Sequence, residues 1–193
     1  MRDFHVFIEQ QGEQIYVGKI TGSGSEDAIF TYAQEYLDNP SSCPISIHLP
    51  LQAQNFSAEE TSLFFEGLLP EGFTRKCVAG WIHADEYDYL TILAALGREC
   101  LGAIQIIEDG MDVPKAGYQK LTREDVCRLA KEGASEAAEL VTKAHLSLTG
   151  ASGKVGLYYK IDTNEWYLPI GAAPSTHIVK QSHVRLDGIV TNE

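Results

Sequence analysis

Apolar and polar residues alternate along the first fifty residues, and this period of two predicts β-strands. The alternation begins with Phe4, Val6 and Ile8 and resumes after a Gln-Gly turn. The stretch after the turn is 15–20, and the alternation returns twice more, at 28–32 and 45–51. Four short strands joined by tight turns predict a small antiparallel sheet or a partial barrel.

From residue 57 the apolar residues are spaced three and four apart, which predicts helices. Ser57 and Glu60 have the spacing of a capping box at the start of the first helix. Further helical patterns cover 74–82, 88–96 (ending at Gly97), 122–131 and 136–143.

A second β-rich region follows these helices. A strand is predicted at 103–107, and the glycine- and proline-containing stretch 108–120 is the best candidate for a linker. Strands are then predicted at 155–161, 166–168 and 177–180. We therefore expect an α+β fold with a first domain at 1–112 and a second at 113–193.

Charge and cysteine content narrow the class of protein. The net charge is 15 − 27 = −12, which argues against direct binding of nucleic-acid phosphates. The four cysteines lie far apart without C-x-x-C spacing, as reduced thiols do (Cys43, Cys77, Cys100 and Cys127). No long apolar span or signal peptide occurs, so we expect a cytoplasmic protein without membrane contact.

The stretch 147–154, SLTGASGK, has the chemistry of a phosphate-binding loop. Its glycines let backbone N–H groups approach an anion, and Lys180 adds a positive charge from a later strand. The stretch is not a Walker A motif, because Leu148 and Val155 stand where that motif needs a glycine and a hydroxyl. A hairpin turn and a solvated lysine remain the alternative interpretation.

Other catalytic signatures are absent from the sequence. The six histidines lack ligand spacing, and there is no nucleophile-elbow motif or paired-carboxylate pattern. We therefore predict no catalytic residue and no metal ligand within this chain.

Five segments in order resemble the HipA-like serine/threonine kinases of bacterial toxin–antitoxin systems. They are ISIHLPL at 45–51, FFEGLLPEG at 64–72, LGRECLGAI at 96–104, the loop at 147–154 and THIVK at 176–180. The resemblance implies that the second domain is the N-lobe of a kinase, with a small antiparallel sheet.

The resemblance also implies the residues of a nucleotide site. The ATP phosphates would be bound by Lys180 and by a loop of six residues: Thr149, Gly150, Ala151, Ser152, Gly153 and Lys154. Ser147 matches the serine that such kinases autophosphorylate. This chain departs from the family at Ser152-Gly153, where members commonly have Gln-Glu, so its loop is expected to be looser.

In the family, the catalytic aspartate, the metal-binding aspartate and a helical C-terminal lobe follow the part that resembles this chain. The resemblance thus implies the N-terminal half of a kinase, inactive without that lobe, which would use ATP and Mg²⁺ to phosphorylate a protein. Its expected partners are a HipB-like antitoxin or a complementary kinase lobe.

Two alternatives stay open. The chain could be a non-enzymatic regulator that binds an antitoxin or a kinase, or a degraded reading frame without activity.

Overall fold

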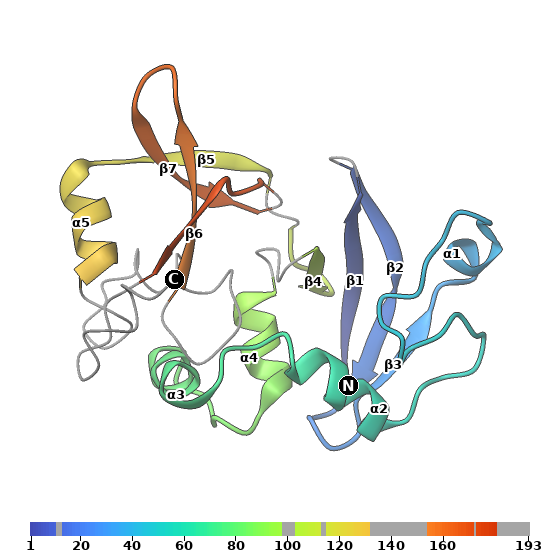
Figure 1. The fold of residues 1–193 in the computed structure, drawn as a ribbon. Helices are drawn as coiled ribbons and strands as arrows, with labels where there is room; N and C mark the ends of the chain where they lie inside the picture. The colour runs from blue at the N-terminus through green and yellow to red at the C-terminus, as the bar shows by residue number, and fades with distance from the viewer. Residues whose placement is uncertain (11–12, 98–102, 113–114, 132–153, 172, 181–193) are drawn as a thin grey trace.

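The computed structural model describes residues 1–10, 13–97, 103–112, 115–131, 154–171 and 173–180. The chain forms two four-stranded antiparallel sheets with helices, which confirms the predicted α+β class. In Figure 1 the first sheet (β1 to β4) stands to the right and the second (β5 to β8) to the upper left.

The first sheet has the strand order β3-β2-β1-β4. Its strands are β1 (Arg2–Gln10), β2 (Glu13–Gly22), β3 (Ile29–Tyr32) and β4 (Ile104–Glu108). The alternation in β1 places Phe4 and Val6 in the core with no exposed surface. Antiparallel pairing of β1 with β4, from Phe4–Glu108 to Ile8–Ile104, joins segments that are far apart in the sequence.

Residues 45–51 do not form the strand that their alternation predicts. The segment contains only an isolated bridge that ends at Leu49. Leu49 is buried, whereas Ile47 is 87% exposed. Pro44 and Pro50 flank the segment and lack the N–H group that a strand ladder needs, so the chain turns here instead of pairing.

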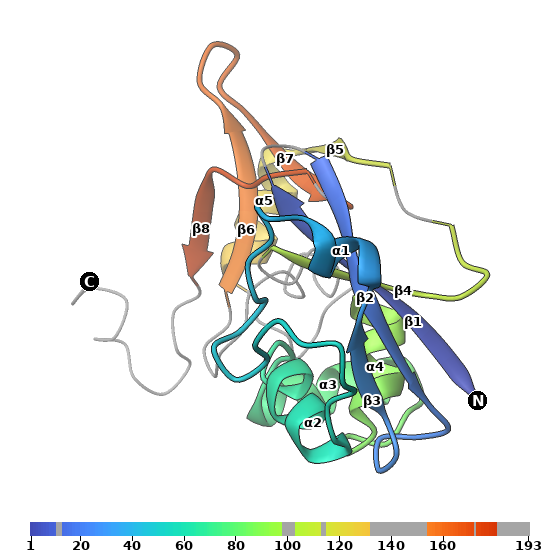
Figure 2. The ribbon, with the colours of Figure 1, turned by 90° about the vertical axis from the view of Figure 1, so that its right-hand side faces the viewer.

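Four helices accompany the first sheet, and none in the described part of the chain is long and apolar enough to cross a membrane. They are α1 (Gln34–Asp38), α2 (Ala58–Glu66), α3 (Gly72–Trp81) and α4 (Tyr89–Leu96). The last three confirm the helices expected from the spacing, while α1 was not predicted. α2, α3 and α4 lie together in the lower half of Figures 1 and 2, beside the first sheet. Sheet and helices share one core, whose largest members include Phe4, Phe30, Phe56, Phe65 and Tyr89.

The predicted capping box is present at the start of α2. Ser57 Oγ accepts a hydrogen bond from the Glu60 N–H at 3.2 Å, and Glu60 Oε2 accepts one from the Ser57 N–H at 2.8 Å. These two bonds pair backbone groups that a helix start otherwise leaves to solvent. The Ser57 hydroxyl donates to Glu60 Oε2 at 2.7 Å, and this bond, together with the one from the Ser57 N–H, lowers the pKa of the Glu60 carboxyl.

The second sheet has the strand order β5-β7-β6-β8. Its strands are β5 (Gly117–Leu121), β6 (Lys154–Lys160), β7 (Glu165–Ile170) and β8 (His177–Lys180), with helix α5 (Arg123–Lys131) after β5. β5 overlaps residues 117–120 of the stretch 108–120 predicted as a linker, and β4 includes residue 108, so that prediction was wrong at both ends of the stretch. The helix expected at 136–143 lies outside the described residues.

Each sheet has its own hydrophobic core. The second core consists of Leu121, Leu129, Val155, Leu157 and Leu168, with Val126, Trp166 and Val179 packed against it. The domain boundary expected after residue 112 falls between β4 and β5 and stays a prediction.

Candidate functional site

The two lysines singled out in the sequence lie opposite each other in the second sheet. Lys154 is the first residue of β6 and Lys180 the last of β8. The antiparallel register makes them direct partners. Such partners have Cα atoms about 4.5–5.5 Å apart, so residues 26 positions apart in the chain meet at one end of the sheet.

The other predicted site residues lie outside the described residues. They are Ser147 and the five loop residues Thr149, Gly150, Ala151, Ser152 and Gly153. The polypeptide joins this loop to β6 at Lys154, beside the position of Lys180.

Alternate apolar residues hold the two lysine-bearing strands in register. Val155 and Leu157 of β6 have no exposed surface, and Val179 of β8 packs against the same core. Ile178, one position before Val179, is 60% exposed and pairs with Gly156. Gly156 itself is buried, so the exposed apolar surface next to the paired lysine positions belongs to Ile178.

The start of β8 is fixed by Thr176 and His177. The Thr176 N–H donates to the Leu157 carbonyl and Thr176 Oγ1 accepts from the Tyr159 N–H, both at 2.9 Å. The His177 ring contacts the rings of Tyr159 and Trp166 edge-on, at centroid distances of 5.5 and 5.4 Å. Thr176 and His177 therefore fix the start of β8, so these two residues of the THIVK motif have a structural role.

The charges along β6 favour an anion at the Lys154 end. Neither β6 nor β8 contains an aspartate or glutamate. The nearest acidic partner in the ladder, Glu165 of β7, pairs with Lys160 at the opposite end of β6. A hydrogen bond from Lys120, with further hydrogen bonds from Tyr167 and Thr163, lowers the pKa of Glu165 to about 2. The acidic group is thus kept away from the paired lysine positions in a chain whose net charge is −12.

Sequence reasoning missed an aromatic cluster on the same sheet. The rings of Tyr118 and Tyr158 have centroids 4.5 Å apart, and Tyr167 lies edge-on to both. Tyr118 is 41% exposed. The sequence gives no clear signal for β5, because its residues GYQKL do not alternate between apolar and polar and the nearby glycine and proline residues suggested a linker.

The arrangement of the strands can be followed in two views. Figure 2 shows β8 beside β6 at the edge of the second sheet, and Figure 1 shows α5 packed near the opposite edge, by β5. β8 therefore has one side unpaired among the described strands. This edge and the loop before β6 delimit the candidate site.

The comparison with protein families matches residues 10–107 to the HipA N-terminal domain. Three relatives support the match. "Putative kinase Y4mE" of Sinorhizobium fredii is 32% identical over 186 residues, which cover 92% of this chain and 43% of that protein. The "Serine/threonine-protein kinase toxin HipA" of Shewanella oneidensis is 24% identical over 176 residues, 90% of this chain and 39% of that protein. An uncharacterized protein of Haemophilus influenzae is 29% identical over 112 residues, 56% of this chain and 98% of that protein.

Among solved structures, the chain is similar to one of the Shewanella oneidensis toxin–antitoxin system, a complex of HipA, HipB and operator DNA. The TM-score is 0.67 at 22% identity, with 91% of this chain and 40% of that chain covered. The likeness shows a shared fold. The chain spans about two fifths of the length of the two kinase relatives and of this structure.

Proposed function

Because this chain belongs to the HipA kinase family and carries its N-terminal region, we propose that it supplies the phosphate-binding part of a serine/threonine protein kinase toxin. The observation that carries the proposal is the pairing of Lys154 with Lys180 at one end of β6 and β8. Two lysines at neighbouring positions create a strong local positive charge, as binding of a triphosphate requires.

The loop that precedes β6 completes the phosphate site in this proposal. Residues Thr149, Gly150, Ala151, Ser152 and Gly153 offer backbone N–H groups to the phosphates of ATP, and Lys154 and Lys180 neutralise their charge. The exposed apolar side chain of Ile178, two positions before Lys180, provides a surface for the base. The absence of acidic residues from β6 and β8 favours the anion.

Ser147 is the proposed regulatory residue. A phosphoserine there carries about −1.5 to −2 charges, next to a loop that binds phosphate. Repulsion between the modified serine and ATP would lower the affinity of the loop for nucleotide. Autophosphorylation at Ser147 would thus silence the kinase.

Phosphoryl transfer also needs Mg²⁺ and a positioned base. In HipA-like kinases the aspartates for both roles belong to the C-terminal lobe. Residues 1–193 by themselves are therefore proposed to bind ATP without transferring its phosphate to a protein.

The proposed partner is a HipB-like antitoxin. The solved relative from Shewanella oneidensis is a complex with HipB and operator DNA. The net charge of −12 favours contact with a basic protein surface over direct contact with DNA.

Calorimetric titration with ATP tests the nucleotide proposal. Wild-type residues 1–193 should bind ATP with a saturable isotherm, and Lys180→Ala or Lys154→Ala should weaken binding at least about tenfold. Lys160→Ala is the matched control, since Lys160 lies at the other end of β6 beside Glu165, and it should leave the affinity unchanged. No saturable binding, or equal losses in all three variants, would contradict the proposal.

One observation favours a second candidate function. The relative from Haemophilus influenzae is matched over 98% of its length by 112 residues of this chain, so that part of the fold occurs as a separate protein. The chain could accordingly act as a non-enzymatic regulator that binds an antitoxin or a kinase. Binding of an antitoxin without any binding of ATP would favour this function over the first.

A further inference from the structure

A pocket unrelated to the candidate nucleotide site opens between α2, α4 and the loop that joins β2 to β3. Its volume is about 450 Å³. It is lined by Ser25, Glu26, Ala58, Glu59, Ser62, Glu66, Tyr87 and Tyr89. None of these residues belongs to the second sheet, so the pocket is independent of β6 and β8.

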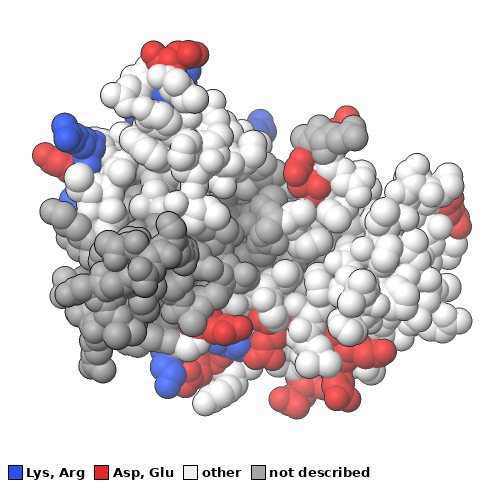
Figure 3. Space-filling model, in the orientation of Figure 1, with Lys and Arg blue, Asp and Glu red and all other residues white. Residues whose placement is uncertain are grey.

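The walls of the pocket are acidic. Glu26 comes from the β2–β3 loop, whereas Glu59 and Glu66 come from the two ends of α2. Glu66 is paired with Arg75, whose Nη1 lies 2.7 Å from Glu66 Oε1. No ion pair links Glu26 or Glu59 to any basic residue in the described part of the chain. Acidic side chains gather along the lower edge of the molecule in Figure 3, the region of α2, α3 and α4 in Figure 1.

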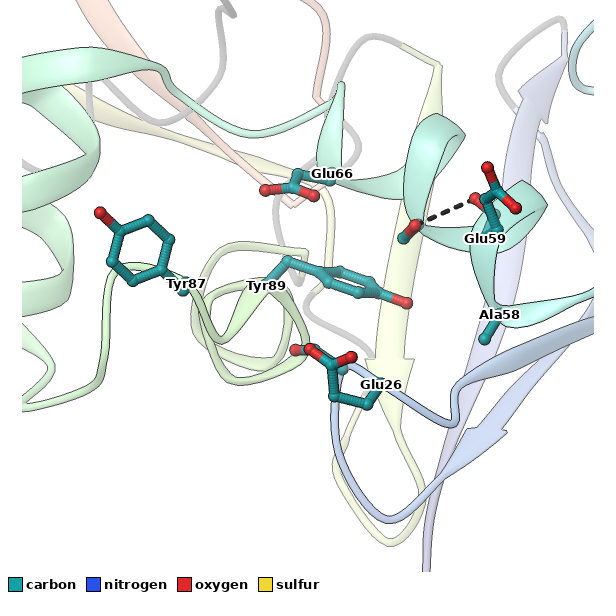
Figure 4. A pocket seen from close by; sticks show the side chains of 8 residues that line it. Glu26, Ala58, Glu59, Glu66, Tyr87 and Tyr89 are labelled. Carbon is teal, nitrogen blue, oxygen red and sulfur yellow. Dashed lines mark hydrogen bonds between the residues drawn. The ribbon is translucent and has the colours of Figure 1, made fainter.

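The second observation is the side chain of Tyr89. Its ring lies between Glu66 and Glu26 in Figure 4, and the residue is only 2% exposed. Its buried hydroxyl has no hydrogen-bond partner among the described residues. Burial, reinforced by the charges of Glu66, Asp88, Asp27 and Glu26, raises the pKa of this phenol, so it stays neutral and can both donate and accept. A buried polar group without a partner costs free energy, which a polar ligand group would recover.

Acidic walls favour a positively charged ligand, and the spacing of the carboxylates indicates which kind of cation fits the pocket. No set of three metal-ligating side chains converges on one point within the described residues, so a small metal ion does not fit these separated carboxylates. A guanidinium group is planar and carries five donors, which suits several acceptors spread around a cavity. Tyr87, 78% exposed, lines the side of the pocket away from the Tyr89 hydroxyl in Figure 4 and offers an apolar face to the methylene groups of such a side chain.

The chain already contains a guanidinium group bound by one of the carboxylates that line the pocket. Besides its bond to Glu66, Arg75 donates through Nε to the Glu86 carbonyl at 2.6 Å, and its side chain is 14% exposed. Glu66 thus already binds one guanidinium group from the side of α3.

We propose that this pocket is a docking site for an arginine side chain of a protein partner. Glu26 and Glu59 supply the charge and the Tyr89 hydroxyl accepts from the guanidinium group, while Tyr87, on the side of the pocket away from that hydroxyl in Figure 4, packs against the aliphatic part of the arginine side chain. The acidic net charge of the chain draws a basic partner surface toward the pocket.

The test is a titration of residues 1–193 with the peptide acetyl-Gly-Arg-Gly-amide, followed by NMR. The same peptide with citrulline in place of arginine is a neutral probe of similar shape. The same peptide with lysine in place of arginine carries a positive charge but lacks the planar guanidinium group. The double variant Glu26→Gln/Glu59→Gln and the single variant Tyr89→Phe probe the pocket. Glu35→Gln, on α1 and outside the pocket, is the matched control.

The arginine peptide should bind saturably and more tightly than the lysine peptide, and the citrulline peptide should not bind. The double variant should weaken binding at least about tenfold, while Glu35→Gln leaves it unchanged. Tyr89→Phe should weaken binding without lowering the melting temperature, because the hydroxyl has no hydrogen-bond partner within the part of the free protein that the structure describes. Equal binding of lysine and arginine peptides, equal affinity in the double variant and the control, or no saturable binding would overturn the proposal.

Discussion

The carbonyl of Gly97, at the end of α4, accepts a hydrogen bond of 2.7 Å from the N–H of Ile106 in β4. This bond joins a helix to the strand that completes the first sheet. The approach is close: a Cβ atom at position 97 would lie 2.7 Å from the Leu93 carbonyl oxygen and 2.8 Å from Ile106 Cβ. A residue without a side chain is therefore required at this contact.

Gly97→Ala should destabilise the fold. The methyl group would push α4 away from β4, and overpacking of this kind costs about 1–3 kcal/mol in free energy of unfolding. Urea denaturation followed by circular dichroism measures the loss. Gly80→Ala is the control, since a Cβ there meets nothing within 4 Å and alanine favours the helix. Equal stability of the two variants would show that α4 and β4 are not packed as described.

Ser147→Glu should lower the affinity for ATP, because it places a fixed negative charge beside the proposed phosphate loop. Its effect should be smaller than that of a phosphoserine, which carries about −1.5 to −2 charges. Calorimetric titration compares it with Ser147→Ala, which should bind as the wild type does. Ser41→Glu, in the exposed loop after α1, changes the net charge equally and should have no effect. A loss of affinity as large in Ser41→Glu would mean that net charge alone is responsible.

The pair between Glu165 and Lys120 predicts a pH dependence of stability. Because the pKa of Glu165 falls from 4.5 to about 2 in the folded protein, the folded state favours its charged form. The stabilisation is complete above pH 4.5 and is lost as the pH falls toward 2.

Thermal melts of the wild type and Glu165→Gln across this range measure the effect. The difference between their melting temperatures should narrow as the pH is lowered. It should also shrink with added salt, since the pair lies at the surface. A difference that does not change with pH would mean that the pair makes no contribution through charge.

Local patterns in the sequence predicted the elements whose causes are local. The capping box of Ser57 and Glu60 lies within four residues, and the structure contains both of its hydrogen bonds. The helix end at Gly97 and the strand alternation of β1 were predictable for the same reason. Each depends on neighbours in the chain and not on the rest of the fold.

Features that depend on distant partners were not predictable. The flanking prolines end the strand pattern at 45–51, but where the segment packs depends on a distant residue: the Leu49 carbonyl accepts a 2.6 Å hydrogen bond from the hydroxyl of Tyr32, and Leu49 is buried. β5 exists because Gly117 to Leu121 pair with β7, far along the chain. Sequence alone could place Lys154 and Lys180 on strands, but their register follows from the pairing of those strands.

The acidic pocket shows a further limit of sequence reasoning. Glu26, Glu59 and Tyr89 come from three separate segments, and each has an ordinary neighbourhood in the sequence. Glu59, in the first turn of α2, looks like a residue that stabilises a helix start. Only the packing of α2 against α4 brings these groups around one cavity.

The strand order β3-β2-β1-β4 has a consequence for synthesis on the ribosome. The hairpin of β1 and β2 can form as soon as it leaves the exit tunnel, but β1 gains its second neighbour only after Glu108 has emerged. During that interval one side of β1 offers unpaired backbone groups to any passing strand. Nascent chains that stall before this point are the ones most exposed to misassembly.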